Sequence, residues 1–201
     1  YVYSLGHVRA QARALRAVAA VDRWHYALKA NPHPAILRAL HEEGFAFECV
    51  SLAEVEAVRA TLPALPPGRI LFTPNFAPRE EYAAALELGV RVTLDTLHPL
   101  AHWGGLFGGR EIHLRVDLGV GRGHHDKVRT GGADSKFGLP LEQLDAFVPL
   151  AQANRTRIVG LHAHLGSGIL ENPHWAEVCG QLASIAERIG SVTFLNLGGG
   201  L

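Results

Sequence analysis

The stretch HYALKANPHP, from His25 to Pro34, predicts a strand, a turn and the beginning of a helix. Its first six residues form an apolar, strand-like run that carries a lysine, Lys29, near its end. Pro34 suits the first turn of a helix, because proline lacks the N–H group that this turn leaves unpaired. Lysine is seldom fully buried without a partner. We therefore expect Lys29 to lie at an open strand end or to take part in chemistry.

The same pattern of a strand followed by a helix recurs along the chain. The predicted strands are 25–30, 46–51, 69–74, 91–96, 110–117, 157–166 and 193–198. The predicted helices are 7–20, 34–43, 52–62, 78–88, 97–107, 140–153 and 173–189. Such repeats without a hairpin signal predict a parallel sheet with right-handed crossovers. We predict an α/β fold of the (β/α)8 TIM-barrel type that lacks its eighth strand, with an open doubly wound sheet as the alternative.

One face of nearly every predicted strand carries a polar residue near the carboxyl end of the strand. These residues are Lys29, Glu48, Thr73, Asp95, His113, Arg115, Asp117, His162, His164 and Asn196. Barrel enzymes place their active sites at the carboxyl ends of the strands. A solvated sheet face is the alternative, but both faces of a parallel sheet are normally covered. The pattern therefore predicts a polar pocket at these strand ends.

Two glycine-containing turns predict an anion site at the same end. HLGSG, residues 164–168, ends the sixth predicted strand, and NLGGGL, residues 196–201, ends the seventh. Glycines let backbone N–H groups approach an anion, and the Ser167 hydroxyl can donate as well. Barrels recurrently build phosphate sites from their last strand-end loops. The two turns together predict a two-sided phosphate cradle beside His164, whose imidazole could lie flat against a planar ring.

Composition limits the partners that the chain can have. Lys and Arg together number 19, as do Asp and Glu, so no basic surplus indicates a nucleic acid or a membrane surface. The two cysteines, Cys49 and Cys179, have no metal or disulfide spacing, which fits the reducing cytoplasm. No apolar run approaches the ~20 residues needed to span a bilayer. The chain has no methionine, and we expect it to belong to a longer polypeptide.

A metal site is the competing interpretation of the sixth strand. His162 and His164 are two residues apart, so on a strand they share one face and could both bind a metal, as in barrel hydrolases. Among the polar residues predicted at the strand ends, His113 is the one other histidine that could join them as a metal ligand. The insertion 118–139, with its GRGHHDK run, is either an active-site loop or a plain surface loop.

Seven stretches in this order resemble the pyridoxal phosphate (PLP)-dependent amino acid decarboxylases, whose barrel is alanine-racemase-like. They are YALKAN (26–31), FECVS (47–51), ILFTPN (70–75), LRVDLGVGRGHH (114–125), SKFGL (135–139), GLHAHLGSGI (160–169) and LNLGGGL (195–201). The resemblance spans essentially the whole chain, which we take as one PLP-binding barrel domain, 1–201, truncated after strand seven. HAHLGS is similar to the diaminopimelate branch rather than to ornithine decarboxylase. NPHPAIL, the stretch that follows Lys29 and Ala30, differs from the sequence that follows the lysine of alanine racemases, which argues against a racemase.

The resemblance implies a role for each matching residue. Lys29 would form the Schiff base with PLP, His164 would stack on its ring, and Glu48 would lie near the cofactor. The phosphate would be held by Ser167, Gly198, Gly199 and Gly200. The implied reaction is decarboxylation of meso-diaminopimelate to L-lysine by a cytoplasmic homodimer with shared active sites. Ornithine, lysine or arginine decarboxylation, a non-catalytic PLP-binding barrel and a metal-dependent hydrolase remain alternatives.

The resemblance also implies parts that residues 1–201 do not supply. In the family, the acid that holds the pyridine nitrogen follows strand eight, and a downstream β-domain contributes a Cys and a Tyr. We therefore expect these residues alone to bind PLP weakly at best and to lack decarboxylase activity. The insertion 118–139 argues against the non-catalytic carrier, which is a single domain without it.

Overall fold

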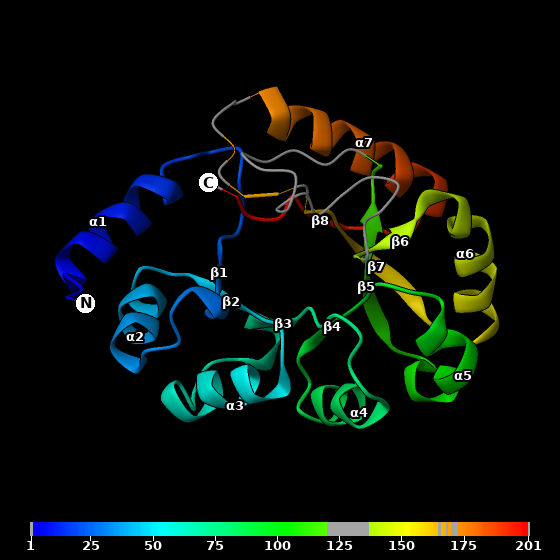
Figure 1. Cartoon of the computed structure of the whole chain (residues 1–201), viewed down its shortest axis with the longest axis horizontal. Coiled ribbons are helices and arrows are strands. Elements are labelled where there is room, and N and C mark those ends of the chain that lie inside the picture. Colours follow the sequence, from blue (N-terminus) through cyan, green and yellow to red (C-terminus); the bar gives the residue numbers. More distant parts are fainter. Residues whose placement is uncertain (1, 120–136, 165, 168, 170–172, 201) are drawn as a thin grey trace. The chain divides into compact units, whose positions relative to one another are not determined.

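A computed structural model describes residues 2–119, 137–164, 166–167, 169 and 173–200 of the chain. It divides into two compact units, Tyr1–Val92 and Thr93–Leu201. Figure 1 shows that both units are built from helices and short strands. Within the part of the chain described, no helix has the length and apolar character that crossing a membrane requires.

The first unit alternates strands and helices. Its helices are α1 (Leu5–Arg16), α2 (Pro34–Glu42), α3 (Leu52–Thr61) and α4 (Arg79–Glu87). Its strands are β1 (His25–Ala27), β2 (Ala46–Cys49), β3 (Ile70–Phe72) and the start of β4 (Arg91–Leu94). Two short 3-10 helices, η1 (Leu28–Ala30) and η2 (Pro67–Arg69), follow β1 and precede β3. Neighbouring strands pair in chain order, β1 with β2, β2 with β3 and β3 with β4, and every pair is parallel.

Local signals in the sequence set the ends of these helices. Pro34 stands at the first position of α2, and Gly44, just beyond its end, has a φ of +84° that favours glycine. The Ser51 hydroxyl accepts from Glu54 N at 3.3 Å at the start of α3. In return, Glu54 Oε2 accepts from Val50 N at 2.8 Å. This reciprocal arrangement satisfies backbone donors that a helix start leaves unpaired.

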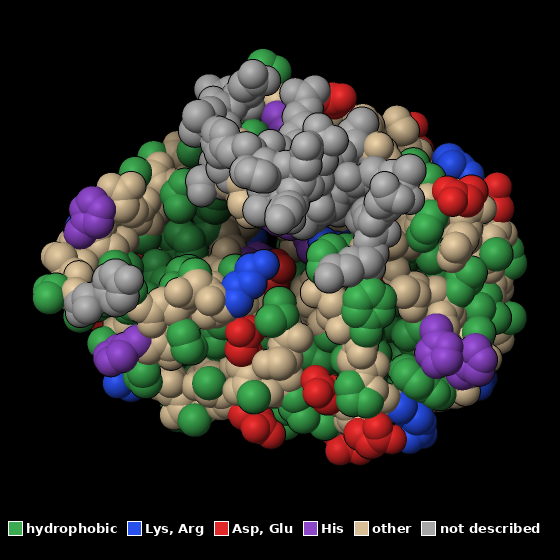
Figure 2. Space-filling model, viewed as in Figure 1, with side chains coloured by type: hydrophobic (Ala, Val, Ile, Leu, Met, Phe, Trp, Pro, Cys, Tyr) green, Lys and Arg blue, Asp and Glu red, His purple; other side chains and the backbone are tan. Residues whose placement is uncertain are grey.

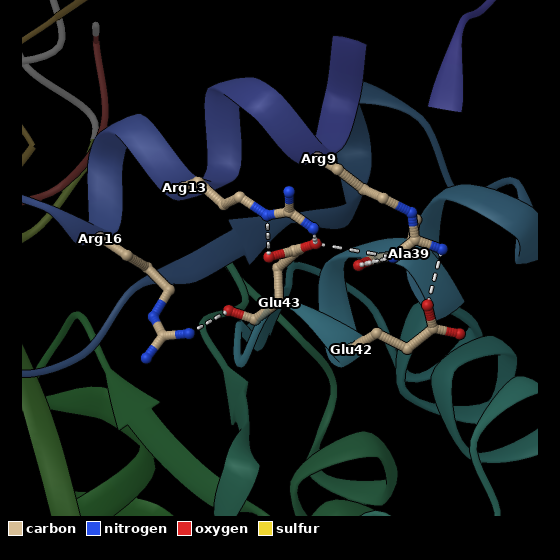
Figure 3. A network of polar contacts seen from close by, with 6 residues as sticks. All are labelled: Arg9, Arg13, Arg16, Ala39, Glu42 and Glu43. Atoms are coloured by element: carbon tan, nitrogen blue, oxygen red, sulfur yellow. Dashed lines mark hydrogen bonds and ion pairs between the residues drawn. The ribbon is translucent and has the colours of Figure 1, made fainter. Parts of the chain in front are cut away.

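An ion-pair network joins α1 to the end of α2 (Figure 3). Arg13 Nε and Nη2 donate to the two carboxylate oxygens of Glu43 at 2.9 and 2.7 Å. Arg16 Nη1 donates to the Glu43 carbonyl at 2.9 Å, and Arg9 pairs with Glu42 at 2.6 Å. The hydrogen bond from Arg13, and then the nearby arginine charges, hold the pKa of Glu43 below its usual value. The network therefore supports the apolar contact of α1, formed by Ala12, Ile36, Leu40 and Phe45.

The second unit continues the same alternation. Its elements are the end of β4, α5 (His98–Phe107), β5 (Glu111–Asp117), β6 (Leu139–Pro140), η4 (Leu141–Gln143), α6 (Leu144–Ala153), β7 (Arg157–His162), α7 (Pro173–Ile189) and β8 (Phe194–Asn196). β5 pairs with β4, β6 and β7, and β7 pairs with β8, always parallel. Figure 1 shows α5, α6 and α7 on one side of β5 and β7. Strands that follow chain order with helices on one side are typical of a β/α barrel rather than of a doubly wound sheet.

Most predicted elements are present, but several boundaries were wrong. The first strand ends at Ala27 rather than at residue 30, because Leu28–Ala30 turns into η1. The sixth predicted strand, β7, ends at His162 rather than at residue 166. β6 has only two residues and was not predicted. The long helix α7 spans 173–189 as predicted. The insertion 118–139 lies largely outside the described residues.

Charged side chains of both signs are interspersed on the surface shown in Figure 2. This distribution agrees with the equal numbers of acidic and basic residues in the sequence.

Candidate active site

In the first unit, Lys29 lies immediately beyond the carboxyl end of β1. It belongs to η1, where Leu28 is fully buried and Lys29 is exposed. The next turn is held by its own side chains, since His33 N donates to Asn31 Oδ1 at 3.0 Å and Ala35 N to His33 Nδ1 at 3.2 Å. Lys29 therefore lies at the strand end with its side chain exposed, directly before this fixed turn. The position agrees with the first of the two predicted alternatives, an open strand end, although Lys29 is not part of the strand, and its chemical role stays a prediction.

Glu48 lies on β2 and shares a sheet face with Ala27. The register pairs Ala27 with Glu48, and Glu48 with Leu71 of β3. Glu48 is half-buried, whereas its neighbour Cys49 points to the opposite face and is fully buried. Burial, followed by the charges of Glu54 and Glu48, strongly raises the pKa of the Cys49 thiol. The carboxylate thus lies on the same face as the end of β1, and the thiol is part of the core.

In the second unit, two successive rows of side chains cross the sheet. The register aligns Thr93, His113, Gly160 and Phe194 in the first row, and Arg115, His162 and Asn196 in the second. The His113 ring lies 5.1 Å from the Phe194 ring and covers Gly160, where a Cβ would come within 2.5 Å of His113 Nδ1. The first row is therefore packed core, and the second row holds the polar groups. This register confirms the predicted alternation of these residues.

The loops after β7 and β8 are bound to each other beside the second row. Gly199 N donates to His164 Nδ1 at 3.3 Å, and Gly198 N donates to Asn196 Oδ1 at 2.9 Å. Ile169 N donates to the Gly200 carbonyl at 2.8 Å. These bonds bring His164 and the triple glycine together, as the sequence predicted.

Close approach of the two loops requires glycine. Gly198 has a φ of +74°, and a Cβ there would lie 2.6 Å from the Ala163 carbonyl oxygen. Gly200 has a φ of +111°, and its Cβ would lie 2.5 Å from the Gly166 carbonyl oxygen. Ser167 is exposed beside them, while Gly168 lies outside the described residues. Glycine-lined loops of this kind let the backbone come close to a ligand, so the arrangement fits an anionic group such as a phosphate.

The metal hypothesis receives no support from the part of the chain that the structure describes. Within it, no group of three or more His, Cys, Asp or Glu side chains is placed to hold a metal ion. β7 ends at His162, so the strand alternation that would give His162 and His164 a common face stops before His164. The Nδ1 atom of His164 also accepts the hydrogen bond from Gly199.

Parallel strands in chain order, with glycine-containing loops at their carboxyl ends, are typical of a β/α-barrel protein. Residues 5–201 match the family described as "Pyridoxal-dependent decarboxylase, pyridoxal binding domain", and the chain belongs to this family. A diaminopimelate decarboxylase of Methanothermobacter thermautotrophicus is 36% identical over 182 residues, which are 88% of this chain and 42% of that relative. The chain thus spans less than half the length of this relative.

Solved structures agree with this assignment. A crystal structure of diaminopimelate decarboxylase superposes with a TM-score of 0.85 at 30% identity, covering 97% of this chain and 46% of that chain. A variant of the Helicobacter pylori diaminopimelate decarboxylase complexed with L-lysine gives a TM-score of 0.87 at 23% identity, covering 99% and 53%. The predicted fold, part of an alanine-racemase-like barrel, is confirmed. The predicted cofactor class, pyridoxal phosphate, is confirmed by the family.

Sequence reasoning missed two features of this site. It placed Asp95 and Arg115 on the inward face, but it did not recognise that they are neighbours across β4 and β5. It also missed the bond from Gly198 N to Asn196 Oδ1, which orders the start of the triple glycine. A two-residue spacing between an Asn and a Gly at a strand end is a signal that could have found the second feature.

Proposed function

We propose that this chain forms the cofactor-binding part of a PLP-dependent decarboxylase that converts meso-diaminopimelate to L-lysine. The observation that carries the proposal is the 36% identity to a diaminopimelate decarboxylase over 88% of this chain. The glycine cradle beside His164 supports it, because PLP carries a phosphate and a planar ring that such a site fits. Bound PLP supplies the electron sink for the negative charge left at Cα when carbon dioxide departs.

Lys29 is the proposed point of covalent attachment. Its exposed side chain lies in η1, just beyond the carboxyl end of β1, and the turn that follows is held by Asn31 and His33. A lysine amine that reaches a reactive carbonyl can bind it covalently once it loses its proton. A fixed turn directly after η1 limits movement of the backbone that carries Lys29, which favours one productive orientation of the amine.

The residues of the second unit are proposed to hold the cofactor's other groups. Ser167 and the backbone N–H of Gly200 would donate to the phosphate, while Gly198 and Gly199, whose N–H groups donate to Asn196 and His164, would let the loop lie close to it. The imidazole of His164, fixed through its Nδ1 by Gly199, would lie against the ring. In the first unit, Glu48, half-buried on the face that ends beside Lys29, would also lie near the cofactor. Together these groups would orient the bond to the departing carboxylate.

The family resemblance also leads us to propose a cytoplasmic homodimer with shared active sites. Sedimentation of the full-length polypeptide tests the oligomeric state, and a monomer at all concentrations would contradict it.

The attachment test uses the full-length polypeptide that contains these residues. It is incubated with PLP, reduced with borohydride, and its modified lysine is mapped by peptide mass spectrometry. We expect the adduct on Lys29 and its loss in Lys29→Ala. Lys127→Arg is the matched control, which should keep the adduct on Lys29. An adduct elsewhere, or none, would overturn the assignment of Lys29.

The substrate is tested by release of carbon dioxide from meso-diaminopimelate, L-ornithine, L-lysine and L-arginine in parallel. We expect the highest kcat/KM with meso-diaminopimelate. A preference for one of the other amino acids would replace the substrate and leave the cofactor assignment in place.

A further inference from the structure

Two buried residues with ionisable side chains, Asp95 and Arg115, lie near each other on the site face of the second unit. The register aligns Leu94, the last residue of β4, with Leu114 of β5, so Asp95, which follows β4, comes next to Arg115 of β5. Asp95 is 2% exposed and Arg115 is 6% exposed. Among the described residues, Arg115 is the one buried lysine or arginine. A buried guanidinium is costly unless an opposite charge accompanies it, so this pair needs an explanation.

The Arg115 and Asp95 side chains have different surroundings. The Arg115 guanidinium carbon lies 5.1 Å from the centre of the Phe137 ring, a cation–π distance. Asp95 Oδ2 is buried and has no hydrogen-bond partner in the part of the chain described. Burial raises the pKa of Asp95, and the charge of Arg115 opposes that rise. Of the influences on the pKa of Asp95, the charge of Arg115 is thus the largest one that lowers it.

The pair continues directly into the glycine cradle. Arg115 is aligned with His162, and His162 with Asn196. Asn196 Oδ1 accepts from Gly198 N, the first N–H of the triple glycine. The buried guanidinium therefore belongs to the same row of side chains as the residue that orders the proposed phosphate loop.

We propose that Asp95 is a positioning residue for the cofactor site, which holds the Arg115 guanidinium on the face beneath the cradle. This inference rests on the proposed function. A positive charge in this row favours binding of an anionic cofactor, and arginine has a long side chain that needs a fixed partner to stay there. Asp95 thus acts through Arg115 and need not touch the cofactor.

A double-mutant cycle tests this dependence in the full-length protein. Asp95→Asn, Arg115→Gln and the double variant are prepared without cofactor, and the Kd for PLP is measured by absorbance titration. Asparagine keeps the size of the side chain and removes its charge. We expect Asp95→Asn to weaken binding about tenfold, as couplings between contacting side chains allow. In the Arg115→Gln background the same change should have no further effect.

Asp145→Asn is the matched control. It makes the same chemical change at an exposed carboxylate, which pairs with Arg188 at 2.9 Å on the surface. We expect its Kd for PLP to equal that of the unmodified protein. Thermal unfolding of each cofactor-free variant separates a loss of fold from a loss of binding. If Asp95→Asn does not fold, Asp95→Glu is carried through the same cycle, and its effect must also vanish in the Arg115→Gln background.

Two results would overturn the inference. One is an unchanged Kd in a folded Asp95 variant, and the other is the same fold-change with and without Arg115, which would mean independent roles. Failure of the unmodified protein to bind PLP would instead overturn the proposed function. The titration therefore distinguishes failure of this inference from failure of the proposed function.

Discussion

Replacing Gly198 by alanine tests whether the closeness of the two loops builds the cofactor site. The added Cβ would lie 2.6 Å from the Ala163 carbonyl oxygen and 2.9 Å from His164 Nδ1. Both distances are shorter than the contacts that Cβ atoms make in proteins, so the loop must move away from β7. Movement of the loop would stretch the hydrogen bond from Gly199 N to His164 Nδ1, which is already 3.3 Å long.

The size of the effect follows from the backbone angle and from the contact. Gly198 has a φ of +74°, and a left-handed conformation costs an L-residue roughly 1–2 kcal/mol. If the loop relaxes when no cofactor is bound, cofactor binding must restore the strained conformation. The free energy of this strain then reduces the binding free energy by the same amount. A cost of about 1.4 kcal/mol is tenfold in Kd, so we expect PLP binding to weaken by about tenfold or more.

The assay is titration of cofactor-free full-length protein with PLP, followed by thermal unfolding of the same samples. Gly190→Ala is the matched control, because Gly190 has a φ of +77° but no heavy atom within 4 Å of its Cβ position. It should carry the same backbone strain at the end of α7 without changing the Kd. Equal Kd values for Gly198→Ala and Gly190→Ala would refute the reasoning, since contact with Ala163 and His164 would then not matter.

Two further predictions concern the first unit and the cysteines. Because its ion pair lowers the folded-state pKa of Glu43, this carboxylate stabilises the fold above its unfolded pKa of about 4.3, and the stabilisation is lost as the pH falls through the folded pKa. Glu43→Gln should therefore lower the melting temperature at pH 7, and the decrease should become smaller as the pH falls below about 4.3. A decrease that does not depend on pH would contradict this. Glu42→Gln, at a more exposed ion pair, should lower the melting temperature less. Of the two cysteines in this chain, only Cys179 should react with a thiol reagent in the native protein, because Cys49 is buried with a raised pKa. Mass spectrometry of labelled peptides checks this, and rapid native labelling of Cys49 would show that the core of the first unit opens.

The alternation of residue types along the chain was enough to predict most of the elements. Helix α7 was predicted at 173–189 because one apolar stripe runs along its length. The polar residues at the strand ends were predicted to share a face because side chains alternate along a strand, and the register of β5, β7 and β8 agrees. These are local properties, and the order of residues in the chain already contains them.

Tertiary structure decided which of these residues meet. Asp95 and Arg115 are neighbours because β4 and β5 pair in one register, and a shift of one residue would separate them. Lys29 stands on a 3-10 turn that follows β1 and in which Leu28 is buried, which the strand-like run did not reveal. Gly198 must be glycine because Ala163 and His164 pass beside it. Contacts between residues distant in the chain depend on how strands pair and loops pack, and local residue patterns do not specify those distances.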